Sequence, residues 1–100
     1  KGILVVGLDR PNLAPAIGAS ASIDVESDSP FVLSMSGAMA GASIGPQNLG
    51  FVSFPNVTPG PVTPIVSFPD GECLVFPAEE GVGEVTVTGG EVSVIAYTCR

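Results

Sequence analysis

The chain contains no histidine and no tryptophan, and its only basic residues are Lys1, Arg10 and Arg100. Histidine is the commonest general base and a frequent metal ligand, so the chain lacks the side chain on which much acid–base and zinc chemistry depends. Three cations among 100 residues leave no basic stripe that could neutralise a phosphate backbone or dock on an anionic lipid surface. We therefore expect no nucleic-acid partner, no membrane partner and no cofactor.

A Gly-x-Ser-x-Gly motif, which in some hydrolases carries the nucleophile, occurs at residues 41–45 with Ser43 at its centre. A serine nucleophile needs a base to take its proton, and this role normally falls to histidine. Because the chain has no histidine, we interpret the match as accidental. Carboxylates are more numerous, but nothing in their spacing sets two of them across a cleft. We predict a protein that is not an enzyme.

Apolar residues make up 45% of the chain and charged residues only 13%, with a formal net charge of −7. One hundred residues form a single domain, 1–100, and a domain of this size can bury only part of its apolar surface. An apolar excess at this size indicates that a partner covers part of the surface. We expect a homo-oligomer, with a trimer as the first choice, although dimers are commoner in general.

Alternation of apolar and polar residues predicts an all-β fold. Residues 22–27 and 31–36 both alternate, and the turn residues between them predict two adjacent strands. In the second segment Phe31, Leu33 and Met35 are expected to point inward. Short strands separated by turn-formers are typical of a small antiparallel sandwich or barrel, here of about seven to eight strands.

Glycine marks two further features of the expected fold. Residues 84–88 and 91–98 have strand composition and flank Gly89 and Gly90, which favours a two-residue β-hairpin with the valines of its strands facing each other. In residues 37–45 glycine recurs at every fourth position, which weakens a helix. We expect a loop or a glycine-kinked strand there.

Six prolines fall between residues 51 and 77, and the unit Val-Ser-Phe-Pro occurs twice among them. Because proline cannot donate a ladder hydrogen bond, each Phe-Pro step is expected to end a strand. The predicted strands therefore cover residues 51–54, 64–68 and 73–76.

Residues 56–63 are predicted to form a stiff, extended loop between two of these strands. Its prolines leave the loop little conformational entropy to lose on binding, which favours contact with a neighbouring subunit or a capsid surface. The residues assigned to partner binding are Val57, Thr58, Pro59, Pro61 and Val62.

Three acidic residues, Asp24, Glu26 and Asp28, alternate along one face of the first predicted strand pair. Such carboxylates are Ca²⁺ ligands when carbonyls and waters complete the shell. The interpretation that we favour is a solvated outer face of an antiparallel strand, with no metal bound.

Cys73 and Cys99 are the only cysteines. In an oxidising compartment they would form one disulfide, worth about 3 kcal/mol in the chain-entropy model. In a reducing cytosol they would be two separate buried thiols. The sequence leaves both alternatives open.

The composition of the whole chain, which is small, apolar, acidic and without catalytic groups, resembles that of the small decoration (cement) proteins of tailed-phage capsids. The resemblance rests on no diagnostic motif, so it carries over no site residue. It implies a compact β domain that binds and stabilises a viral shell as a homo-oligomer, with the virion as its location. The alternative is a secreted or cell-surface β-sandwich recognition module with one disulfide.

Overall fold

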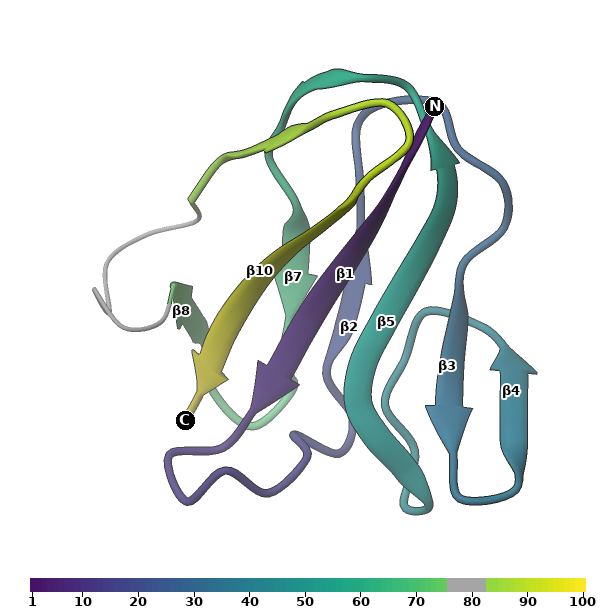
Figure 1. The fold of residues 1–100 in the computed structure, drawn as a ribbon. Coiled ribbons are helices and arrows are strands. Elements are labelled where there is room, and N and C mark those ends of the chain that lie inside the picture. Colours follow the sequence, from purple (N-terminus) through teal and green to yellow (C-terminus); the bar gives the residue numbers. More distant parts are fainter. Residues whose placement is uncertain (76–82) are drawn as a thin grey trace.

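A computed structural model describes residues 1–75 and 83–100, and these residues form ten strands with no helix among them (Figure 1). The predicted all-β class is therefore confirmed. The strands outnumber those expected because several have only three residues. They are β1 (Gly2–Asp9), β2 (Ser20–Ser22), β3 (Phe31–Ser34), β4 (Gly37–Ala40), β5 (Asn48–Val57), β6 (Gly60–Val62), β7 (Ile65–Ser67), β8 (Cys73–Val75), β9 (Val85–Val87) and β10 (Val92–Cys99).

Six strands form the main sheet, in the order β4-β3-β5-β1-β10-β8. β1 and β10 pair in parallel, and the other neighbours are antiparallel. The prediction of a purely antiparallel sheet is therefore wrong, and the sheet is mixed. The reason is that β1 and β10, the first and last strands, run side by side in the same direction (Figure 1). Its outermost strands, β4 and β8, do not pair with each other in the described residues, so the sheet does not close into a barrel.

Two small antiparallel sheets, β2–β7 and β6–β9, accompany the main sheet. β2 and β7 lie behind it in Figure 1, and the shortest extent of the molecule, 18 Å, accommodates two layers about 10 Å apart. The core fills the space between the layers. Its main-sheet residues are Leu4, Val6, Leu8, Val52, Phe54 and Tyr97, and the small sheets add Ala21, Val62 and Val87.

The segments 22–27 and 31–36 do not form the predicted pair of adjacent strands. β2 ends at Ser22 and pairs with β7, and the residues that follow leave the ladder. β3 pairs instead with β4 and β5. The prediction failed because alternation identifies strand-like segments, whereas the choice of partner depends on residues distant in sequence.

The face of β3 that points inward is also the opposite of the predicted one. Val32 is buried opposite Val52, whereas Leu33 is 37% exposed and Met35, in the turn after the strand, is 91% exposed. Phe31 is half-buried on the same side as Leu33. A period of two fixes which residues share a face, but only the pairing with β5 decides which face meets the core.

The predicted C-terminal hairpin is wrong as a pairing, although its turn is present. β9 pairs with β6 and β10 pairs with β1, so the turn passes from one sheet to another. Gly90 has a φ of 77°, and its N–H donates to the Lys1 carbonyl at 2.9 Å. The difference in length explains the choice of partner. β9 has only three residues that could pair with β10, whereas β1 pairs with β10 over most of its length.

The Phe-Pro step at Pro55 does not end its strand. β5 continues through Pro55 to Val57, and its register with β1 shifts between Gly2 and Leu4. Asn56 has a φ of 52° at this irregularity. A β-bulge leaves one residue outside the ladder, which is how a strand accommodates a residue without an N–H.

Tyr97 is expected to be replaceable by phenylalanine with a gain in stability. It is 1% exposed, and its hydroxyl has no hydrogen-bond partner in the described part of the chain, while burial raises its pKa. A buried hydroxyl without a partner costs about 1–3 kcal/mol. We expect Tyr97→Phe to raise the free energy of unfolding in urea by about 1 kcal/mol. A loss of that size would show that the hydroxyl is hydrogen-bonded.

Candidate interaction surface

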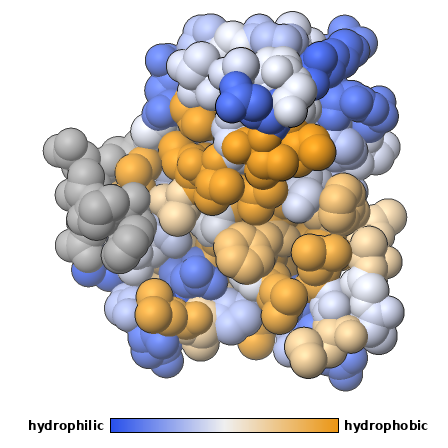
Figure 2. Space-filling view, viewed as in Figure 1, coloured by the Kyte–Doolittle hydropathy of each residue, from blue (hydrophilic) through white to orange (hydrophobic). Residues whose placement is uncertain are grey.

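The side of the main sheet that points away from the core, here called the outer face, carries a group of exposed or half-buried apolar side chains. It is formed by alternate residues of four neighbouring strands, from β3 to β10. Figure 2 shows apolar side chains gathered across this side of the molecule. Its exposed or half-buried members are Leu33, Leu49, Phe51, Ile3, Val5, Val92 and Val94.

Strand register brings these side chains into contact. The parallel ladder sets Ile3 beside Val92 and Val5 beside Val94. Gly7 lies opposite Phe51, and a Cβ at Gly7 would be 3.7 Å from the ring. Because glycine has no side chain, the Phe51 ring lies close to the backbone of β1 and joins the two halves of the face.

The outer face is large for a protein of this size. Val92 and Val94 are 61% and 60% exposed, and Ile3 and Phe51 are 41% and 40% exposed. With Leu33 and Leu49, the exposed apolar area is on the order of 500 Å², near the upper end for the largest patch of a monomer. For comparison, a stable interface buries about 800 Å² per partner, and the exposed apolar area of this face is more than half of that.

Asp9 alternates with Ile3 and Val5 along β1 and is the charged residue at the margin of the outer face, whereas the members named above are apolar, although the chain carries a net charge of −7. Asp9 lies at the end of β1, and burial raises the pKa of its carboxyl. Glu91 immediately precedes β10. Acidic groups therefore occur at the ends of the central strands, and the middle of the face is neutral.

Two features of the sequence carry the signal for this face. No charged residue lies between Asp28 and Asp70, and this stretch supplies β3, β4 and β5. The run from Ile3 to Val6 is apolar at every position, which is typical of a strand buried on both faces. Only one face of β1 meets the core, so the other is available for a partner.

The structure divides the residues predicted to bind a partner. Val57 and Val62 are 0% and 1% exposed and belong to the core, which corrects their assignment to a partner surface. Thr58, Pro59 and Pro61 are exposed. The expected loop is mostly strand, because β5 reaches Val57 and β6 begins at Gly60. Composition could not reveal that the two valines point inward on either side of a tight turn.

The three acidic residues considered as calcium ligands are exposed on the segment after β2. Asp28 accepts a hydrogen bond from the Asn56 side-chain amide at 2.5 Å. The carbonyl of Glu26 accepts from the Thr58 N–H at 3.0 Å. Asp24, Glu26 and Asp28 do not form a three-ligand metal cluster, and none occurs elsewhere in residues 1–75 and 83–100.

Ser43 of the Gly-x-Ser-x-Gly motif lies in a bridge to Ser20 and is exposed. The next residue, Ile44, is buried and exchanges backbone hydrogen bonds with residues 18 and 19. The segment thus ties the main sheet to the second layer. It has neither the strand-to-helix turn nor the base that a serine nucleophile requires.

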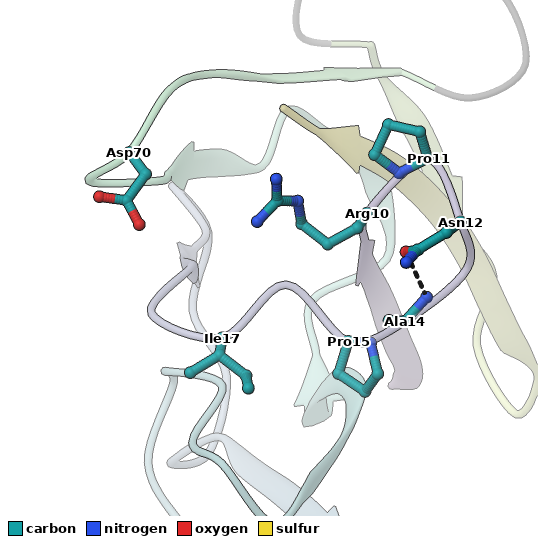
Figure 3. A pocket seen from close by; sticks show the side chains of 7 residues that line it. All are labelled: Arg10, Pro11, Asn12, Ala14, Pro15, Ile17 and Asp70. Carbon is teal, nitrogen blue, oxygen red and sulfur yellow. Dashed lines mark hydrogen bonds between the residues drawn. The ribbon is translucent and has the colours of Figure 1, made fainter.

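A surface hollow of about 630 Å³ lies beside the end of β1 (Figure 3). The Arg10 guanidinium and the Asp70 carboxylate face into it from two loops. Arg10 also lies over the Phe68 ring at 5.2 Å, and the Ala14 N–H donates to Asn12 Oδ1 at 3.1 Å. The hollow is open to the surface, and Arg10 and Asp70 are the charged residues among those that line it.

Cys73 and Cys99 are joined by a disulfide between β8 and β10. Both are buried, and the neighbouring residues Glu72 and Arg100 exchange two backbone hydrogen bonds of 3.0 and 2.9 Å. The bridge fastens the short edge strand β8 to the main sheet. Of the two alternatives left open by the sequence, the structure contains the bridge.

Comparison with known proteins gives no match to any family model, curated protein or solved structure. No helix suited to crossing a membrane is found among the described residues.

Proposed function

We propose that the chain is a β-sandwich structural subunit without catalytic activity, which decorates and stabilises a viral shell as a homo-oligomer. The observation that carries the proposal is the neutral, apolar outer face. A surface of this size on a protein with a net charge of −7 favours coverage by another protein. The number of copies, three by our sequence-based expectation, stays a prediction.

The charge distribution supports a shell partner rather than a small ligand. A flat sheet face has no enclosed cavity, and ligand sites are concave with a few convergent polar groups. A protein interface, in contrast, needs area and an uncharged centre surrounded by polar residues. Asp9 and Glu91 lie at the ends of strands whose middle residues are apolar.

The disulfide favours a second candidate, a secreted or cell-surface recognition module. Structural disulfides persist in oxidising compartments and are rare in the cytosol, where many viral shells assemble. The same outer face would then bind an extracellular protein. The two candidates differ in where the chain is found.

Virus particles purified from the source of the chain are expected to carry it in stoichiometric amounts. Val94→Lys should lower its occupancy on the shell more than tenfold, because a charge would be buried in the interface without a partner. Ser67→Lys, which adds the same charge at an exposed position of β7, is the matched control and should bind as wild type. Occupancy is measured by quantitative mass spectrometry of the particles.

Equal occupancy of wild type and Val94→Lys would contradict the role of the outer face. Recovery of the chain from the medium, with none in particles, would favour the recognition module over the shell subunit.

A further inference from the structure

The edge strand β4 is open to a partner along its whole length. It is the last strand of the main sheet, and all four of its residues are exposed. In Figure 1 it lies at the right-hand border with no ribbon beyond it. Natural sheets usually blunt such an edge with charge, proline or a bulge, and residues 37–40 contain none of these.

The hydrogen-bond pattern shows which backbone groups of β4 are free for pairing. The Gly41 N–H donates to the Pro30 carbonyl at 3.1 Å, so Gly41 faces β3. Bonded and non-bonded pairs alternate along an antiparallel ladder, and Met39 therefore also faces β3. Ala38 and Ala40 then direct their N–H and C=O groups outward, away from the sheet.

We propose that β4 pairs with β4 of a second copy in an antiparallel, twofold-symmetric ladder. In this register Ala38 of each copy lies opposite Ala40 of the other. Each of these two pairs exchanges two N–H···O hydrogen bonds. Met39 lies on the twofold axis opposite its own counterpart. The inference rests on the self-association in the proposed function and names the contact that produces it.

Three observations favour a second copy as the occupant. A strand that is antiparallel to itself satisfies all its outward groups by a twofold contact, the commonest symmetry of homo-oligomers. β4 belongs to the stretch without charged residues, so two acidic chains approach here with little repulsion. Pairing also continues the outer face across both copies, because Ala38 lies beside Leu33 and Ala40 beside Phe31.

Side-chain size fits the same arrangement. Ala38 and Ala40 are small, so the ladder can form without a steric barrier. Met39 is 52% exposed, and its sulfur accepts a hydrogen bond from Asn48 Nδ2 at 3.5 Å, so its exposed part can contact its counterpart across the axis. A twofold contact of this kind gives a dimer, whereas the composition led us to expect a trimer, and the native mass distinguishes the two.

A cysteine placed on the axis tests the register. Opposed residues of a non-hydrogen-bonded pair have Cα atoms about 4.5 Å apart, within the range that a disulfide spans. Met39→Cys is therefore expected to cross-link two copies under mild oxidation, seen as a doubled mass on a non-reducing gel. Ala38→Cys is the matched control, because its counterpart lies roughly 8 Å away and should not cross-link.

A proline placed on the free edge tests the backbone bonds. Ala40→Pro removes an N–H that points away from β3, so the fold remains, whereas Ala40→Ser retains the N–H. Light scattering should give the wild type and Ala40→Ser twice the mass of Ala40→Pro, which should remain at 10.0 kDa. Circular dichroism should show the same β-sheet spectrum for all three proteins.

A wild-type mass of 10.0 kDa at millimolar concentration, a trimer, or cross-linking of Ala38→Cys instead of Met39→Cys would each overturn the inference. Val94→Lys should retain the Met39→Cys cross-link, because β10 lies four strands from β4 in the main sheet. If Val94→Lys abolishes shell binding and the Met39→Cys cross-link still forms, the outer face binds the shell independently of the contact between β4 strands. If the single variant Met39→Cys forms no cross-link, the proposed contact between β4 strands is wrong, and the proposed role of the outer face still stands.

Discussion

Loss of the Cys73–Cys99 disulfide is expected to lower the free energy of unfolding by about 3 kcal/mol. The bridge joins residues 26 apart in the sequence and removes loop-closure entropy from the unfolded chain. β8 has three residues and its only partner among the described strands is β10, so few other contacts hold it. The double variant Cys73→Ala/Cys99→Ala avoids burying an unpaired hydroxyl at Cys99, which is 0% exposed.

The measurement is urea unfolding followed by far-UV circular dichroism, with and without a thiol reductant. Wild type in reductant should unfold at the same urea concentration as the double variant, and the double variant should not respond to reductant. Hydrogen exchange should show that the amides of β8 lose protection before those of β1. An oxidised wild type no more stable than the double variant would contradict the expected contribution of the bridge.

The fold class followed from local pattern, but the topology did not. Alternation identified β3, because it reflects the geometry of a single strand. The glycine spacing of residues 37–45 predicted a loop or a glycine-kinked strand, and β4 is a strand over the first four of these residues. Pairing of β10 with β1 joins opposite ends of the chain, and no local signal encodes it. The Gly89-Gly90 turn was located correctly, yet its flanking strands belong to different sheets.

The candidate site was missed for a related reason. Residues 56–63 were assigned to partner binding because an extended, proline-rich loop has little conformational entropy to lose on binding. Pro55, however, lies within β5 at a bulge, and Val57 beyond it is in the core. The outer face combines residues from β1, β3, β5 and β10, and a face assembled from four distant segments becomes visible only with the register. The sequence held two signals that could have indicated it, the absence of charge between Asp28 and Asp70 and the apolar run from Ile3 to Val6.

Two neighbouring residues of β1 should separate the core face from the outer face. Leu4 is 0% exposed between the layers, and Leu4→Ala is expected to cost about 2–5 kcal/mol through lost burial and the cavity that remains. Ile3 is 41% exposed on the outer face, and Ile3→Ala should cost less, about 1 kcal/mol, because much of the side chain already contacts water in the folded chain and no closed cavity forms. Both are measured by urea unfolding at dilutions where the native mass is 10.0 kDa.

Leu4→Ala should have the larger effect on stability, whereas Ile3→Ala should have the larger effect on shell occupancy. Ile3→Ala removes apolar area from the interface, so the folded protein should occupy fewer sites, whereas the fraction of Leu4→Ala that remains folded should bind as wild type. The two residues are adjacent in one strand, have side chains of the same size and point to opposite faces of the sheet, so the comparison separates the roles of the two faces. If Ile3→Ala destabilised the monomer as much as Leu4→Ala, the outer face would be covered within a single chain. It would then not be available for a partner.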